Sequence, residues 1–177
     1  MGREIRMVPA NYEAPQSECK HWPVCDKKNG HFQPMYDESF EKAANEWLAD
    51  CIAWMNGTHE DFKEYGKEYP YYWMWNSEPP DEKYYRKYKD EEAVWYQLYE
   101  TVSEGTPVTP PFATKEELVD YLVKYGDFWD QNRGEGGWKI ENAEKFVERG
   151  WAPSMIVMKY ENGAKIQMPK DMDLAVA

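Results

Sequence analysis

The chain has 177 residues, a length that suits one globular domain with an extended arm, and its 33 acidic and 21 basic residues give a net charge of −12. This charge disfavours direct binding of a nucleic-acid backbone, because phosphate contacts need clustered Lys and Arg. An apolar run of about 18 residues and a charged-then-apolar leader are both missing, so we expect no membrane span and no secretory signal. Three cysteines, an odd number, argue against a disulfide framework and favour a reducing, intracellular compartment.

Residues 1–36 are rich in proline, charge and short polar side chains without periodicity, so we predict an irregular, extended arm ahead of a single domain at 37–177. The arm holds enough ligands for a tetrahedral zinc ion: Cys19, His21, Cys25 and His31. Their spacing contains no CxxC or HxxxH pair. The segment WPVCDKKNG resembles the CPxCDGxG turn of small zinc-binding knuckles, with Trp22 where the first cysteine would stand. Two interpretations stay open, a zinc site and a metal-free aromatic turn, and we expect the metal to be absent or weakly held.

The strongest helical signal lies between residues 37 and 57. Asp37 or Ser39 can cap the start of this helix, and Asn56-Gly57 can end it. Cys51 falls in its apolar stripe, so we interpret this residue as a small buried hydrophobe rather than a reactive thiol. The stripe consists of Phe40, Ala43, Ala44, Trp47, Leu48, Cys51, Ile52 and Met55.

Aromatic and acidic residues concentrate in the segment 60–92. The range 37–92 carries fifteen acidic and seven basic side chains, a net charge of −8. Tyr and Trp are rotamer-poor anchors that dominate protein interfaces, and carboxylates suit a host protein with a basic surface. The predicted partner-binding residues are Tyr71, Tyr72, Trp73, Trp75, Asp81, Glu82, Tyr84, Tyr85, Asp90, Glu91 and Glu92. The alternative is that the segment wraps the domain and buries its rings, with acidity serving only solubility.

The clearest local signals for secondary structure lie between residues 95 and 126. An aromatic, β-branched run at 95–102 predicts a strand that ends in a turn. The prolines between 107 and 111 lack backbone donors, so the link that follows must be extended and lie at the surface or at a sheet edge. Thr114 and Glu117 form a capping-box pattern, which starts a short helix that ends at a glycine.

The C-terminal part predicts a glycine-rich loop at 127–138, a second short amphipathic helix from Ile140, and a hairpin over 154–168 around Asn162-Gly163. The predicted fold class is α+β. One long N-terminal amphipathic helix and two short helices pack on a small antiparallel sheet built from 95–102 and the hairpin.

The sequence shows no GxSxG elbow, no HExxH pair and no glycine-rich nucleotide fingerprint, so we expect no enzyme and no cofactor other than the zinc considered above. The segment YQLYETVSEGTPVTPPFATKEELVDYL resembles an uncharacterised family of tailed-phage and prophage proteins. The resemblance extends to MGREIRMVP, FQPMYDESFEKAANEWLADCIAWMNG and GWAPSMIVM and so covers most of the chain. It implies a viral protein in the host cytoplasm and no particular chemistry.

Two hypotheses about function follow. The first is a small phage accessory protein that binds and inhibits a host protein or complex. An example of such a target is a host defence complex with a basic nucleic-acid groove, which an anti-CRISPR-like or anti-restriction protein would block. The second is a virion structural or assembly protein with no inhibitory role.

Overall fold

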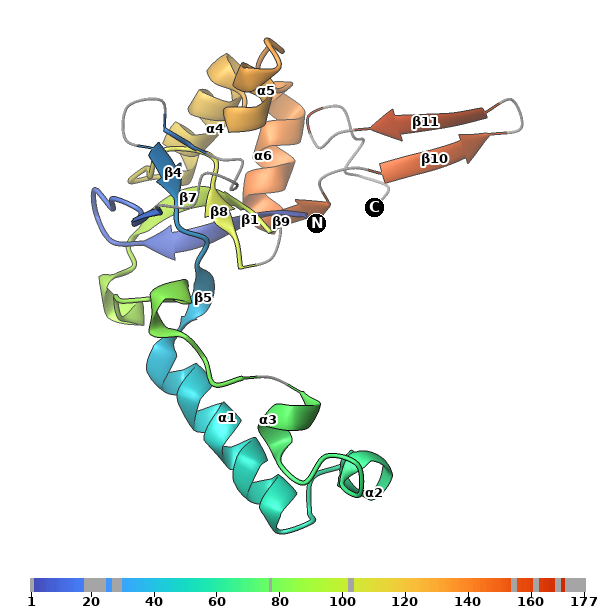
Figure 1. Ribbon diagram of the computed structural model, residues 1–177. Coiled ribbons are helices and arrows are strands. Elements are labelled where there is room, and N and C mark those ends of the chain that lie inside the picture. Colours follow the sequence, from blue (N-terminus) through green and yellow to red (C-terminus); the bar gives the residue numbers. More distant parts are fainter. Residues whose placement is uncertain are drawn as a thin grey trace. The chain divides into compact units, whose positions relative to one another are not determined.

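The computed structural model describes residues 2–17, 25–26, 30–76, 78–101, 104–153, 156–160, 163–167 and 170, with the backbone alone for 25–26, 30, 156–160 and 163–167 (Figure 1). The chain divides into two compact units. Met1–Met35 and Tyr88–Ala177 together form the sheet unit, and Tyr36–Lys87 forms the helical unit. The helical unit is therefore an insertion within the sheet unit, a division that differs from the predicted arm at 1–36 and single domain at 37–177.

The sheet unit is built on a four-stranded antiparallel sheet in the order β8-β7-β1-β9 (Figure 1). Its strands are β1 (Gly2–Val8), β7 (Trp95–Glu100), β8 (Thr106–Pro107) and β9 (Trp151–Pro153). β1 is central, because Ile5 lies opposite Leu98 of β7 and Arg3 lies opposite Ala152 of β9. The predicted irregular conformation of the arm is thus wrong for Gly2–Val8. Its strand pattern is hidden in the sequence because two of its buried residues, Arg3 and Arg6, are charged.

Three helices lie on the same side of this sheet: α4 (Lys115–Tyr125), α5 (Phe128–Asn132) and α6 (Ile140–Arg149) (Figure 1). The predicted capping box of α4 is confirmed, since the Glu117 amide donates to Thr114 Oγ1 at 3.1 Å and the Glu117 side chain accepts from the Thr114 amide. The core of the unit joins these helices to the sheet. It contains Leu98, Val108, Leu118, Leu122, Trp138, Ala143, Phe146, Val147 and Ala152.

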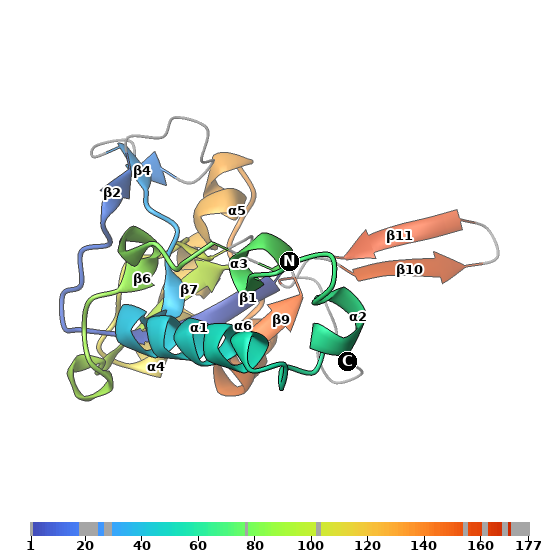
Figure 2. The same cartoon turned by 60° about the horizontal axis from the view of Figure 1, so that its bottom comes forward.

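The proline link behaves as predicted, because Pro107 belongs to β8, an edge strand of the sheet. The hairpin formed by β10 (Ile156–Tyr160) and β11 (Gly163–Gln167) was expected to join the strand at 95–102. Its two strands pair with each other in a separate sheet instead (Figure 2), and β7 pairs with β1 and β8. A further small sheet has the order β2-β4-β3, with strands at Gln16–Ser17, Gly30–Phe32 and Cys25–Asp26.

The helical unit contains α1 (Phe40–Met55), α2 (Phe62–Tyr65), α3 (Tyr72–Trp75) and the 3-10 turn η1 (Glu82–Tyr84). The short parallel pair β5 (Tyr36–Ser39) and β6 (Tyr85–Arg86) joins its two ends. Helices and antiparallel sheets together make the fold α+β, as predicted. Among the described residues, no helix is long and apolar enough to cross a membrane.

The buried face of α1 differs from the predicted stripe. Ala43, Cys51 and Trp54 are buried, whereas Leu48, Ile52 and Met55 are 51%, 59% and 74% exposed. α1 packs against α3, and Phe62 of α2 also contacts Trp54, but these neighbours cover a face narrower than the whole apolar stripe (Figure 1). The prediction for Cys51 is confirmed, and burial, followed by the charge of Asp50, raises the pKa of its thiol.

Candidate functional site

An aromatic cluster forms the interior of the helical unit. Trp54 stacks on Trp75 with ring centroids 5.1 Å apart, and it meets Phe62 edge to face at 5.3 Å. The Trp54 indole Nε1 donates to the Tyr69 carbonyl at 3.0 Å, so its one polar atom is satisfied inside the cluster. Trp75 also stacks on Tyr65 at 5.3 Å and is therefore part of this interior.

Two more of the predicted partner-binding residues are interior residues. The Tyr72 hydroxyl lies 3.1 Å from Asp50 Oδ2 and accepts from Asn76 Nδ2 at 2.7 Å, and burial is the main cause that raises its pKa. Tyr85 is buried between β5 and α1, with its ring 5.0 Å from that of Tyr36. For Tyr72, Tyr85 and Trp75 the internal alternative therefore describes the structure better than a partner contact.

Tyr71 and Trp73 face the other way. α3 is a single helical turn, in which Tyr72 and Trp75 are three residues apart and share the inner face. Tyr71 precedes that turn in an extended conformation, and Trp73 lies on its outer side. Their rings stack in parallel, with centroids 4.6 Å apart and planes 4° apart, while the side chains remain 48% and 45% exposed. With the exposed neighbour Met74 they form a surface that we call the aromatic patch.

The predicted carboxylates fall into two groups. Asp81 and Glu82 are exposed in the helical unit, where Asp81 pairs with Lys83 at 2.6 Å, and the hydrogen bond from Lys83 lowers the pKa of Asp81. Tyr84 lies beside them, half-buried, with the Lys83 ammonium 4.7 Å from its ring centre. The other three carboxylates are exposed on the 3-10 turn η2 of the sheet unit: Asp90, Glu91 and Glu92.

The candidate zinc ligands are described only in part. Cys19 and His21 lie outside the described residues, and the side chain of Cys25 does as well. The backbones of Cys25 and His31 face each other in the antiparallel pair β3–β4. The expectation that metal is absent or weakly held, and the alternative of a zinc site, both stay predictions.

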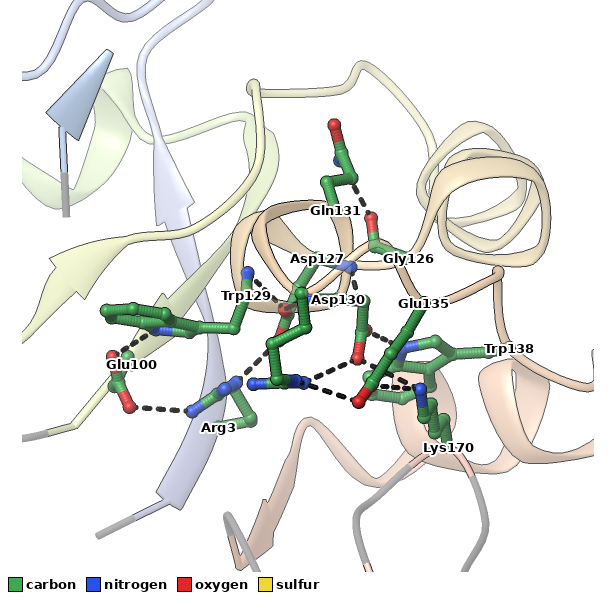
Figure 3. Close-up of polar contacts among 11 residues, drawn as sticks. Arg3, Glu100, Gly126, Asp127, Trp129, Asp130, Gln131, Glu135, Trp138 and Lys170 are labelled. Atoms are coloured by element: carbon green, nitrogen blue, oxygen red, sulfur yellow. Dashed lines mark hydrogen bonds and ion pairs between the residues drawn. The ribbon is translucent and has the colours of Figure 1, made fainter. Parts of the chain in front are cut away.

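A second cluster, which the sequence did not indicate, is a buried charge network in the sheet unit (Figure 3). The Arg3 guanidinium from β1 donates to Asp127 Oδ2 at 2.7 Å and to Glu100 Oε1 at 3.0 Å. Trp129 Nε1 donates to the second oxygen of Glu100 at 2.5 Å. Asp127 Oδ1 also accepts the amides of Trp129 and Asp130 at 2.7 and 3.0 Å, and so caps α5.

Asp130 forms the other half of this network (Figure 3). Its Oδ2 accepts from Trp138 Nε1 at 2.7 Å and from the Asp127 amide at 3.1 Å, and its Oδ1 accepts from Arg133 at 2.9 Å. Lys170 lies 3.5 Å from the same carboxylate and is also bonded to Glu135. The segment predicted as a flexible glycine-rich loop thus begins with a fixed helix. The signal in the sequence was the pair Asp127 and Asp130, which have the spacing of a capping box.

The carboxylates at the centre of this network are each held by several donors. Both oxygens of Asp127 and of Asp130 accept bonds from cations, indoles or backbone amides. The effect of the network is to fasten α5 to β1 and β7. No family model, curated protein or solved structure matches the chain.

Proposed function

We propose that this chain is a phage accessory protein that acts in the host cytoplasm, where it binds and inhibits a host protein with a basic surface. The observation that carries the proposal is the parallel stack of Tyr71 and Trp73, which leaves two large rings about half exposed. Tyr and Trp of this kind are enriched among the few residues that supply most of the affinity of a protein interface.

The aromatic patch is held in place before any partner binds. Tyr72 and Trp75, which alternate with the patch residues along the chain, are anchored on Trp54 with ring centroids 5.9 and 5.1 Å away. A rigid anchor loses little conformational entropy on binding, so more of its contact energy appears as affinity.

The charge of the helical unit favours a basic partner. This unit carries twelve acidic and six basic side chains, a net charge of −6. Carboxylates around an aromatic centre attract a cationic surface and speed encounter, and they repel nucleic acid. A host defence complex of the kind that anti-CRISPR or anti-restriction proteins block has such a cationic groove, which a bound acidic protein would occupy in place of nucleic acid.

The test is capture of a host protein by the intact chain, compared between Trp73→Ala and the control Trp151→Ala. Trp151 is also half exposed but belongs to the sheet unit. With the purified partner, Trp73→Ala should speed dissociation by about 30-fold, the equivalent of ~2 kcal/mol, whereas Trp151→Ala should bind like the parent. The parent should also inhibit the activity of the captured partner.

Charge is tested by neutralising the two groups of carboxylates separately, as Asp81→Asn with Glu82→Gln and as Asp90→Asn with Glu91→Gln and Glu92→Gln. Neutralising the group of carboxylates that borders the interface should slow association and flatten the dependence of the association rate on salt. The dissociation rate should not change. Recovery of virion proteins alone, or binding that Trp73→Ala leaves unchanged, would contradict the proposal. The first of these results would support the virion role.

A further inference from the structure

The sheet unit has an open cleft of about 760 Å³, a size typical of ligand sites. Its lining includes the edge strand β8 with the prolines that follow it, and the segment from Tyr12 to Gln16 that leads into β2. Tyr121 of α4 and Phe128 of α5 also line the cleft, as does Phe32 of β4.

Hydrogen bonds and an ion pair hold the part of the cleft formed by β7, the segment after β8, and α5. The buried Gln97 side chain donates to the Thr109 carbonyl at 2.9 Å and accepts from the Tyr99 hydroxyl at 3.1 Å. The Phe128 amide donates to the Val108 carbonyl at 2.9 Å, and the Arg3–Asp127 ion pair fixes the start of the same helix (Figure 3). This part of the lining is therefore preformed, which lowers the entropy lost when a ligand binds.

The chemistry of the lining selects for a cation. Among the described residues that line the cleft, Glu13 alone is charged, and none is Lys, Arg or His. Pro107, Pro110 and Pro111 have no backbone N–H donors, and the carbonyl of Pro110 already accepts from Thr109 Oγ1 at 2.9 Å. An anionic ligand would find no cationic partner among these described residues, whereas a ligand that carries positive charge would find the Glu13 carboxylate.

The aromatic rings define the rest of the ligand. Tyr12, Phe32, Tyr121 and Phe128 offer apolar surface, and aromatic faces also attract guanidinium and ammonium groups. Arg and Lys side chains combine an apolar stem with such a head. Grooves lined by aromatic residues commonly dock extended peptides.

We propose that this cleft binds an extended peptide segment of a partner protein, with an arginine or lysine side chain directed to Glu13 and its stem along the aromatic rings. The site belongs to the sheet unit and is separate from the aromatic patch. Its test needs no host partner, so it can succeed or fail independently of the proposed function.

The experiment measures retention of capped hexapeptide pools on the immobilised full chain by mass spectrometry. One central position is fixed as Arg, Lys, citrulline, norleucine or Glu, and the other positions are random. Citrulline matches the shape of arginine without its charge. The parent should retain the Arg and Lys pools about threefold or more above the citrulline and norleucine pools, the range of a solvent-exposed ion pair, and should reject the Glu pool.

Three variants locate the binding. Glu13→Gln should remove the preference for Arg over citrulline, and Ala14→Phe should fill the cleft and abolish retention of every pool. Glu141→Gln neutralises an equally exposed carboxylate of the sheet unit outside the cleft and should leave retention unchanged. Circular dichroism tests whether each variant is folded. If Ala14→Phe does not fold, Glu13→Gln still decides the test.

Several results would overturn the proposal. Equal retention of the citrulline and Arg pools would show that charge is not recognised, and a preference that survives Glu13→Gln would place the site elsewhere. Retention of no pool would show that the cleft does not take peptides. Displacement of the best peptide by arginine amide at the same concentration would make a free organic cation the ligand and not a peptide.

Discussion

Buried arginines give the sheet unit much of its specificity at the scale of single residues. Arg6 pairs with Glu4 at 2.5 Å, donates to the carbonyls of Met35 and Glu104, and lies 4.5 Å from the ring centre of Tyr99. Gly105 makes room for it, because a Cβ atom there would lie 2.3 Å from Arg6 Nη2 and the backbone has a φ of +105°. A buried charge is tolerated only with such partners, so these contacts specify one arrangement of β1.

Asp127→Asn tests the other buried arginine. The change removes the charge that faces Arg3 at 2.7 Å and leaves Glu100 as its remaining carboxylate partner. Breaking a buried ion pair from one side typically lowers the free energy of unfolding by about 3–5 kcal/mol. Urea denaturation measures this loss. Asp120→Asn, an exposed carboxylate on α4, is the control and should change stability by less than ~0.5 kcal/mol. Equal stability of the two variants would show that the network does not hold α5.

At the scale of elements, neighbouring residues of one helix alternate between buried and exposed positions. In α3 a single turn directs Tyr72 and Trp75 inward and Trp73 outward, so one aromatic run supplies both a core and a surface. α1 shows a related effect, because its apolar residues exceed what its packing neighbours cover. Composition therefore predicts these helices but not which of their residues are buried.

Leu48→Asp and Trp54→Ala measure the two faces of α1. Leu48 is half exposed, so a carboxylate there stays in water, and the expected cost is about 1 kcal/mol or less, mostly helix propensity. Trp54 is fully buried and packs against the rings of four residues, so its loss should cost about 3–5 kcal/mol. Thermal or urea unfolding gives both values. A cost of several kcal/mol for Leu48→Asp would restore the wider buried stripe that its sequence suggested.

The connection of the two units governs the molecule as a whole. The sheet unit begins with β1, continues through the small β2-β4-β3 sheet, and resumes with β7 only after the helical unit. The pairing of β1 with β7 therefore closes a loop that contains the entire insertion. Folding of the sheet unit depends on a contact between residues about 90 positions apart, which is costly in loop entropy.

Ile5→Pro should unfold the sheet unit. Ile5 lies in the central strand, and its amide donates to the Gly150 carbonyl at 2.8 Å, a bond that proline cannot make. Near-ultraviolet circular dichroism and the dispersion of amide NMR signals report the loss. Ala10→Pro is the matched control. Ala10 precedes Asn11, whose φ is +54°, in a turn closed by Tyr12, and proline is favoured at that position. A folded Ile5→Pro variant would mean that β1 is dispensable.

Local chemistry in the sequence was enough to predict several elements. Thr114 and Glu117 specified the start of α4, the prolines placed β8 at a sheet edge, and helical periodicity located α1, because each of these signals depends on residues a few positions apart. Only the tertiary structure decided that Gly2–Val8 is a central strand, that Leu48 is exposed and that Tyr71 and Trp73 stack at the surface. It also decided that Glu13 lines a cleft whose other described lining residues are uncharged. These features arise from contacts between residues far apart in the chain. Buried charges also hide the apolar period on which a reading of the sequence relies.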